Sequence, residues 1–316
     1  MFVVGAALFH TGLAQKIGIG IVKISGTKES SLMFGIMVVS AALSSCLSNT
    51  GTAACLMPVV LGICAAAKIP ASRQLMPLAY AAGIGGVITM VGTPPNIIVS
   101  GVLTSFGYES FSFFEFAWIG IPLTFVVIAY MMFIGKYLLP KAELDANQEI
   151  EQEIEATVTD SKKQIVSGLI LAVCIIVMAL DLKAISLEMT AIVGALVCVL
   201  TGCLTEKQAY SAIDWVTIFL FAGMIPVATA MNTSGAGKLI AEATVKMLGG
   251  DPSPYMVTAV LFGLAVILTQ FMSNTASKAL LCPVGIALSA QMGASPKAVL
   301  MAILIASSCA FASPVE

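Results

Sequence analysis

A polar stretch, Ser44-Ser45-Cys46-Leu47-Ser48-Asn49-Thr50, interrupts an apolar part of the chain, and Thr269-Gln270-Phe271-Met272-Ser273-Asn274-Thr275 interrupts another. The two stretches lie 225 positions apart, and the same shift places Pro58 on Pro283 without a gap. We therefore interpret them as copies of one internal repeat. Isolated hydroxyls in membrane helices often bond back to their own helix. Two clusters in one register instead indicate a paired site.

The amino-acid composition predicts a membrane protein. Apolar residues make up 59% of the 316 positions and charged residues only 10%, whereas soluble domains are about a quarter charged. Because a bilayer leaves backbone groups no partner but the chain itself, we expect an all-α polytopic protein in contact with the lipid bilayer. The 15 basic residues form no stripe, so nucleic acid is not an expected partner.

Short apolar segments flank both polar clusters and predict two re-entrant helical hairpins, at residues 31–67 and 255–292. The sequence Gly92-Thr93-Pro94-Pro95-Asn96 should break the next helical segment, residues 74–103. Proline removes an amide donor, disfavours helix at the preceding residue and can open a new helix at its first turn. Residues 295–316 look like the truncated start of a second broken helix.

Other segments complete the predicted organisation. Residues 1–24 are apolar and long enough for one span, and the charges of residues 238–248 at four-residue spacing predict a helix lying at the interface. Residues 141–163 carry seven of the 17 acidic residues and predict a cytoplasmic linker. It would separate a first repeat unit, residues 1–140, from a second, residues 164–316.

The motifs together resemble the divalent anion:sodium symporter family, which comprises the di- and tricarboxylate transporters. Members carry paired Ser-Asn-Thr motifs at hairpin tips and Pro-Pro-Asn breaks in neighbouring helices, which stand here as Ser48-Asn49-Thr50, Ser273-Asn274-Thr275 and Gly92-Thr93-Pro94-Pro95-Asn96. The resemblance covers nearly the whole chain and implies an inverted repeat. Family members have further helices at both ends, so we expect residues to be missing before Met1 and after Glu316.

The resemblance also implies two sodium sites beside one anion site. The first sodium site maps to Ser44, Ser48, Asn49 and Gly92, and the second maps to Thr269, Asn274 and the carbonyl of Met272. The anion is expected to meet both motifs, the start of the helix after the break, and one lysine: Ser48, Asn49, Thr50, Ser273, Asn274, Thr275, Thr93, Pro94 and Lys278. Oxygen donors and helix ends are typical of ion sites in such transporters.

Lys278 departs from the repeat, because it stands where the first copy has Ala53, four residues after Asn274. A lysine near a binding tip has three possible roles. It extends to a lipid headgroup, contacts the substrate, or substitutes for a cation.

These observations predict a sodium-coupled symporter of di- or tricarboxylates or a similar divalent anion, multi-pass in the bacterial inner membrane and homodimeric as the family is. The first alternative is a sodium-independent anion exchanger of the same fold. A membrane-embedded enzyme is the distant alternative, because the chain has one histidine and no paired carboxylates within its apolar segments for acid–base catalysis. The sequence leaves the anion open.

Overall fold

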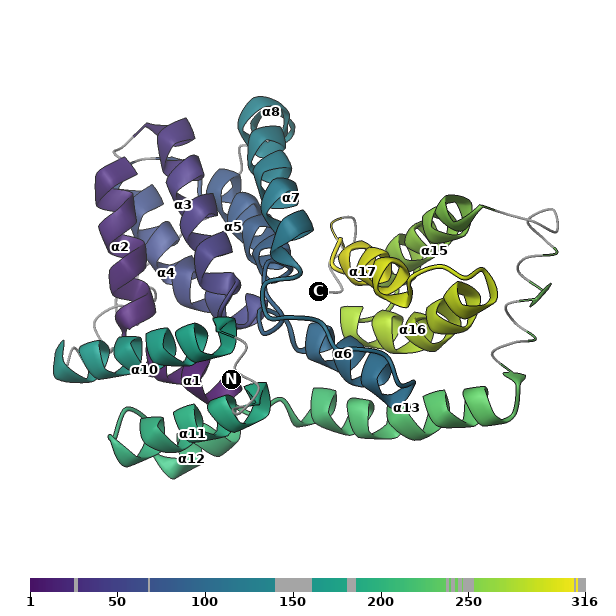
Figure 1. Cartoon of the computed structure of the whole chain (residues 1–316). Coiled ribbons are helices and arrows are strands. Elements are labelled where there is room, and N and C mark those ends of the chain that lie inside the picture. The colour runs from purple at the N-terminus through teal and green to yellow at the C-terminus, as the bar shows by residue number, and fades with distance from the viewer. Residues whose placement is uncertain are drawn as a thin grey trace. The chain divides into compact units, whose positions relative to one another are not determined.

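The computed structural model describes residues 1–25, 28–67, 69–139, 161–180, 186–236, 239, 242–243, 246, 253–309 and 311. This part of the chain is helical and contains no β-strand (Figure 1), as the predicted all-α class requires. The helices are α1 Phe2–His10, α2 Leu13–Ser25, α3 Glu29–Ser44, α4 Asn49–Ala67, α5 Ser72–Gly85, α6 Pro94–Ser105, α7 Ala117–Tyr130, the π-helical η1 Met131–Gly135, α8 Lys136–Leu138, α10 Ser161–Ala179, α11 Leu187–Leu200, α12 Glu206–Ser211, α13 Trp215–Thr233, α15 Pro254–Thr269, α16 Asn274–Gln291 and α17 Pro296–Ser307.

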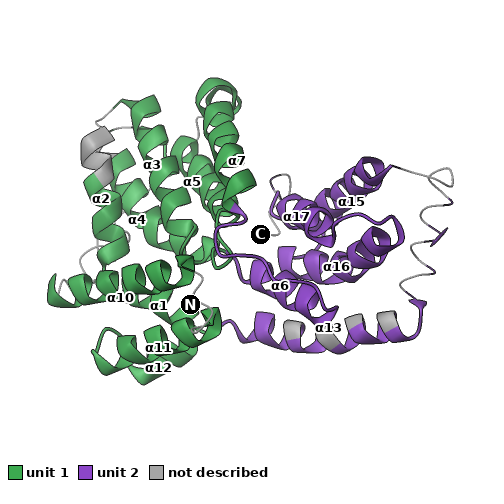
Figure 2. Cartoon of the chain, in the orientation of Figure 1, with its two compact units in different colours: residues 1–92, 117–213 green, residues 93–116, 214–316 purple. Residues whose placement is uncertain are grey.

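The chain divides into two compact units, coloured separately in Figure 2. Unit 1 comprises residues 1–92 and 117–213, and unit 2 comprises residues 93–116 and 214–316. Each unit contains one hairpin followed by a further helix: α3, α4 and α5 in unit 1, and α15, α16 and α17 in unit 2. Residues 141–160 of the predicted linker lie outside the described residues, so the division into repeats at that linker stays a prediction.

The serine of each Ser-Asn-Thr motif begins the second arm of its hairpin. The hydroxyl of Ser48 accepts the amide N–H of Gly51 at 3.2 Å, and that of Ser273 accepts the amide of Ala276 at 3.2 Å. Serine is a favoured N-cap because its side chain satisfies one of the open amides of the first turn. The motif thus starts a helix directly at the tip of each hairpin.

The break after α5 begins earlier than the sequence predicts. Helix α5 ends at Gly85 rather than near Gly92. Gly85 lies so close to α3 that a Cβ atom there would be 2.5 Å from the Ala41 backbone. The chain then folds back on itself, and a Cβ on Gly92 would lie 2.5 Å from the Gly86 carbonyl oxygen. Only glycine fits such a close backbone approach. Thr93 is extended and Pro94 opens α6, as predicted.

The structure divides the predicted span at residues 1–24 into two helices. Helices α1 and α2 meet at an angle of 65°, and Gly12 between them adopts a left-handed φ of 74°, which glycine tolerates without strain. By length and composition, residues 117–138 and 161–179 can each cross a membrane, and the bent pair gives a third span if counted as one. Most of the predicted interfacial helix, residues 238–248, falls outside the described residues.

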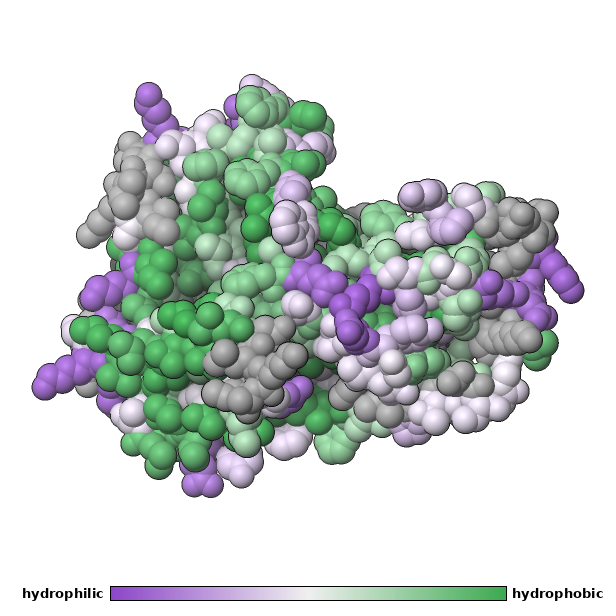
Figure 3. Space-filling view, in the orientation of Figure 1, coloured by the Kyte–Doolittle hydropathy of each residue, from purple (hydrophilic) through white to green (hydrophobic). Residues whose placement is uncertain are grey.

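The outer surface of unit 1 is apolar where α10 and α11 lie (Figure 3). Large side chains there are more than half exposed, among them Leu169, Ile176, Ile192 and Leu196. An exposed apolar patch of this kind on a soluble protein would promote association. In a membrane, an apolar surface of this kind lies against lipid or against another protein chain.

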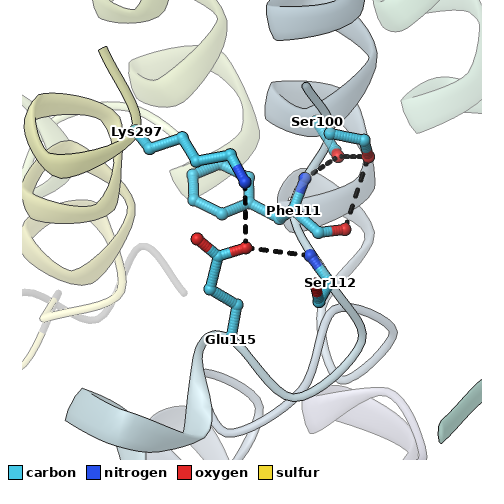
Figure 4. Close-up of polar contacts among 6 residues, drawn as sticks. Ser100, Phe111, Ser112, Glu115 and Lys297 are labelled. Carbon is cyan, nitrogen blue, oxygen red and sulfur yellow. Dashed lines mark hydrogen bonds and ion pairs between the residues drawn. The ribbon is translucent and has the colours of Figure 1, made fainter. Parts of the chain in front are cut away.

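Within unit 2, the segment after α6 is fastened to the first turn of α17 (Figure 4). Glu115 Oε2 lies 3.3 Å from Lys297 Nζ and accepts the Ser112 amide at 2.9 Å. Lys297 Nζ also lies 5.6 Å from the centre of the Phe111 ring, and the Phe111 amide donates to Ser100 Oγ on α6 at 3.2 Å. These contacts connect α6 with α17, which also pack against each other.

Candidate functional site

Three oxygen atoms meet behind the tip of the first hairpin. Ser44 Oγ lies 2.7 Å from Asn49 Oδ1 and 2.6 Å from the carbonyl oxygen of Ala82 in α5. Ser44 is fully buried. A hydroxyl has one hydrogen and can donate to only one of these oxygens at a time. The cluster therefore has more acceptor oxygens than donors, which is the chemistry that a hard cation requires.

The non-helical segment after α5 closes over this cluster. The hydroxyl of Thr89 donates to the carbonyl oxygen of Ser45 and accepts the amide of Gly92 at 3.2 Å. The side-chain amide of Asn49 donates to the carbonyl of Gly83 at 3.4 Å. Gly92, predicted as a sodium ligand, is thus joined through Thr89 to the carbonyl of Ser45, the residue next to Ser44.

The second hairpin repeats this arrangement in unit 2. Thr269 Oγ1 lies 2.5 Å from Asn274 Oδ1 and 2.8 Å from the carbonyl oxygen of Ser307 in α17. Ser307 stands 225 positions after Ala82, the same shift that relates the two tips. Gln270 Nε2 additionally donates to the carbonyl of Cys309 at 3.1 Å. The repeat seen in the sequence therefore extends to the hydrogen bonds.

Helix ends set the electrostatics of both clusters. Ala82 and Ser307 lie in the last turns of α5 and α17, and Ser44 and Thr269 end α3 and α15. The C-terminal end of a helix carries partial negative charge. The Ala82 carbonyl accepts the Gly86 amide at 3.3 Å as well as the Ser44 hydroxyl. Helices α4 and α16 begin at Asn49 and Asn274, so their positive ends lie at the tips. Each cluster therefore presents negative helix ends to a cation and one positive end to an anion.

The other predicted site residues have different surroundings. The hydroxyls of Ser48 and Ser273 serve as helix caps, Thr50 is exposed and Thr275 is half-buried. The amide of Met272 donates to the Leu268 carbonyl at 3.0 Å. Thr93 and Pro94 begin α6 and belong to unit 2.

Two further hydroxyls escaped the sequence analysis. Thr52 and Ser277 stand at equivalent positions, three residues after each motif asparagine. Both are fully buried, and neither hydroxyl has a hydrogen-bond partner among the described residues. The 225-residue shift relates these two positions in the sequence, but their burial required the structure.

Lys278 is fully buried. Its Nζ donates to the hydroxyl of Ser308 at 2.9 Å, and Ser308 directly follows α17. The alternative in which Lys278 extends to a lipid headgroup is therefore wrong, because an ammonium at the headgroup level would be exposed.

Comparison with known proteins agrees with this geometry. A family model described as citrate transporter matches residues 1–306. The chain belongs to this family. The predicted resemblance to the divalent anion:sodium symporters, di- and tricarboxylate transporters, is thereby confirmed.

Relatives in the citrate transporter family include an uncharacterized transporter of Haemophilus influenzae, 30% identical over 93% of this chain and 66% of that protein. The sodium-dependent dicarboxylate transporter SdcS of Staphylococcus aureus is 25% identical over 99% of this chain and 66% of its own length. The chain thus spans about two thirds of the length of these curated relatives. In fold it resembles the crystal structure of the Alcanivorax borkumensis YdaH transporter, with a TM-score of 0.62 and 20% identity over 98% of this chain and 73% of that one.

Proposed function

We propose that the protein is a sodium-coupled secondary transporter of di- or tricarboxylates or a similar divalent anion, multi-pass in the bacterial inner membrane and homodimeric. The observation that carries the proposal is the cluster of Ser44, Asn49 and the Ala82 carbonyl. The Ser44 hydroxyl lies within hydrogen-bond distance of two acceptor oxygens, but it has only one hydrogen to donate. The sodium dependence of the relative SdcS supports it.

In this proposal different groups of the protein bind the sodium ion and the anion. Oxygen atoms at helix C-terminal ends bind sodium, and the positive N-terminal ends of α4 and α16 orient the anion. The remaining motif hydroxyls, Thr50 and Thr275, and the start of α6 at Thr93 and Pro94, complete the anion site. Bound sodium supplies positive charge that a carboxylate needs away from water.

A sodium-independent anion exchanger is the second candidate, and the buried Lys278 is the observation that favours it. A fixed ammonium can supply positive charge without any ion. The oxygen cluster at Ser44 contains no such group among its hydrogen bonds, so we favour the symporter.

Uptake into proteoliposomes tests the proposal. The natural full-length protein should accumulate labelled succinate, malate or citrate when an inward sodium gradient is imposed, and should do so far less with potassium in its place. Uptake that is equal in both salts but requires an anion inside the vesicles would instead identify an exchanger.

The motif asparagines provide the matched variants for that assay. Asn49→Ala removes the side-chain oxygen from the first cluster and Asn274→Ala removes it from the second, so uptake should be abolished in both. Each substitution removes the hydrogen bonds of the asparagine side chain and should lower the free energy of unfolding by about 1 kcal/mol. The purified variants should therefore still fold. Thermal unfolding and size-exclusion chromatography verify folding, and wild-type uptake in either variant would remove that asparagine from the site.

A further inference from the structure

Beside their oxygen clusters the two repeats differ in charge at one position, together with the residue that contacts it. The first repeat has Ala53 in α4 and Gly83 in α5, whereas the second has Lys278 in α16 and Ser308 directly after α17. The two differences are joined, because the Lys278 ammonium donates to the Ser308 hydroxyl at 2.9 Å. At this pair of positions the second repeat therefore carries an ammonium, whereas the first repeat carries no charge.

This ammonium lies beside the second oxygen cluster. Ser308 follows Ser307, whose carbonyl receives the hydroxyl of Thr269. Lys278 itself stands four residues after Asn274, which is about one helical turn. A sodium ion at Thr269 and Asn274 would face a like charge, and such repulsion is strong where water is excluded. The residues of the second cluster therefore do not fit a sodium ion as those of the first cluster do.

We infer that the ammonium of Lys278 takes the place of the second sodium ion, so that each protomer binds one sodium ion, at Ser44 and Asn49. This inference rests on the proposed sodium coupling and gives the stoichiometry of that same site.

Counting bound sodium tests the inference directly. Binding of radioactive sodium to the purified natural full-length protein should reach one ion per protomer in the wild type. Asn49→Ala should abolish this sodium binding. Asn274→Ala, the equivalent substitution in the second repeat, should leave sodium binding intact. Lys278→Arg keeps the charge and should also bind one ion.

Two variants remove the charge. The double variant Lys278→Ala with Ser308→Gly reproduces the residue pair of the first repeat and should bind two ions. Lys278→Met retains the volume of the side chain, and the Ser308 hydroxyl keeps its contact with the Leu304 carbonyl at 3.1 Å, so this variant should fold and should also bind a second ion.

The outcomes separate the inference from the proposed function. Two ions in the wild type would overturn the inference and leave sodium coupling intact, as would equal losses in Asn49→Ala and Asn274→Ala. No bound sodium in a folded wild type that still exchanges anions would overturn the sodium coupling itself. If the charge-removing variants fail to fold, the inference is still tested by comparing the sodium bound by Asn49→Ala with that bound by Asn274→Ala.

Discussion

Ser44 and Ser45 are adjacent, but their hydroxyls make different contacts. The hydroxyl of Ser44 lies between Asn49 and the Ala82 carbonyl, whereas that of Ser45 donates to the carbonyl of Ala42 in its own helix. The first therefore links three elements of the cluster, and the second makes the local bond that any helical serine can make.

This contrast gives a matched pair of variants. Ser44→Ala should weaken the apparent affinity for sodium by about tenfold or more, equivalent to about 1.4 kcal/mol for the loss of one ion ligand. Ser45→Ala should leave it unchanged. The measurement is the sodium dependence of anion uptake at a fixed anion concentration. Equal effects of the two substitutions would show that the hydroxyl at position 44 is not an ion ligand.

At the residue scale the sequence predicted part of the site. The pairs Ser44–Asn49 and Thr269–Asn274 were named from the family resemblance, and both lie in hydrogen-bond contact. The sequence did not predict the backbone carbonyls of Ala82 and Ser307, because every residue has a carbonyl and no side chain marks the ones that take part in the site. The burial of Lys278 also required the structure, since an apolar segment does not show which face of a helix is covered.

Among the elements, the closest approach in unit 1 is between α3 and α5. A Cβ atom on Gly85 would lie 2.5 Å from both the Cα and the carbonyl oxygen of Ala41. Small residues at such crossings let membrane helices pack by their backbones. At this crossing the last turn of α5 brings the Ala82 carbonyl to Ser44 in α3. The prolines predicted the start of α6, but the sequence did not predict the end of α5.

Gly85→Ala should therefore destabilise the protein by about 1–3 kcal/mol, because the neighbouring backbone has to move. Gly20→Ala is the control, since a Cβ at Gly20 in α2 meets nothing within 4 Å, and this change should be neutral or stabilising by up to about 1 kcal/mol. Thermal unfolding of the two purified variants measures the difference. Equal melting temperatures would contradict the close packing of α3 on α5.

For the whole molecule, composition and the repeat predicted the all-α class and the placement of one hairpin in each compact unit. They also predict that the two hairpins enter the membrane from opposite sides, as in other transporters built from inverted repeats. Identical local geometry in the two clusters is compatible with this symmetry, because an inverted repeat preserves the contacts within each unit while it reverses their direction across the bilayer.

Cysteine accessibility tests the inversion. Lys28 precedes α3 and Ser295 precedes α17, and both are exposed. Each lies at the base of a hairpin, and the two bases should face opposite sides of the membrane. In a background with the eight native cysteines replaced, Lys28→Cys and Ser295→Cys should therefore react with a membrane-impermeant maleimide from different sides of oriented vesicles. Labelling of both from the same side, with uptake retained, would mean that the hairpins enter together. The two oxygen clusters could then not flank one anion site as the inverted repeat requires.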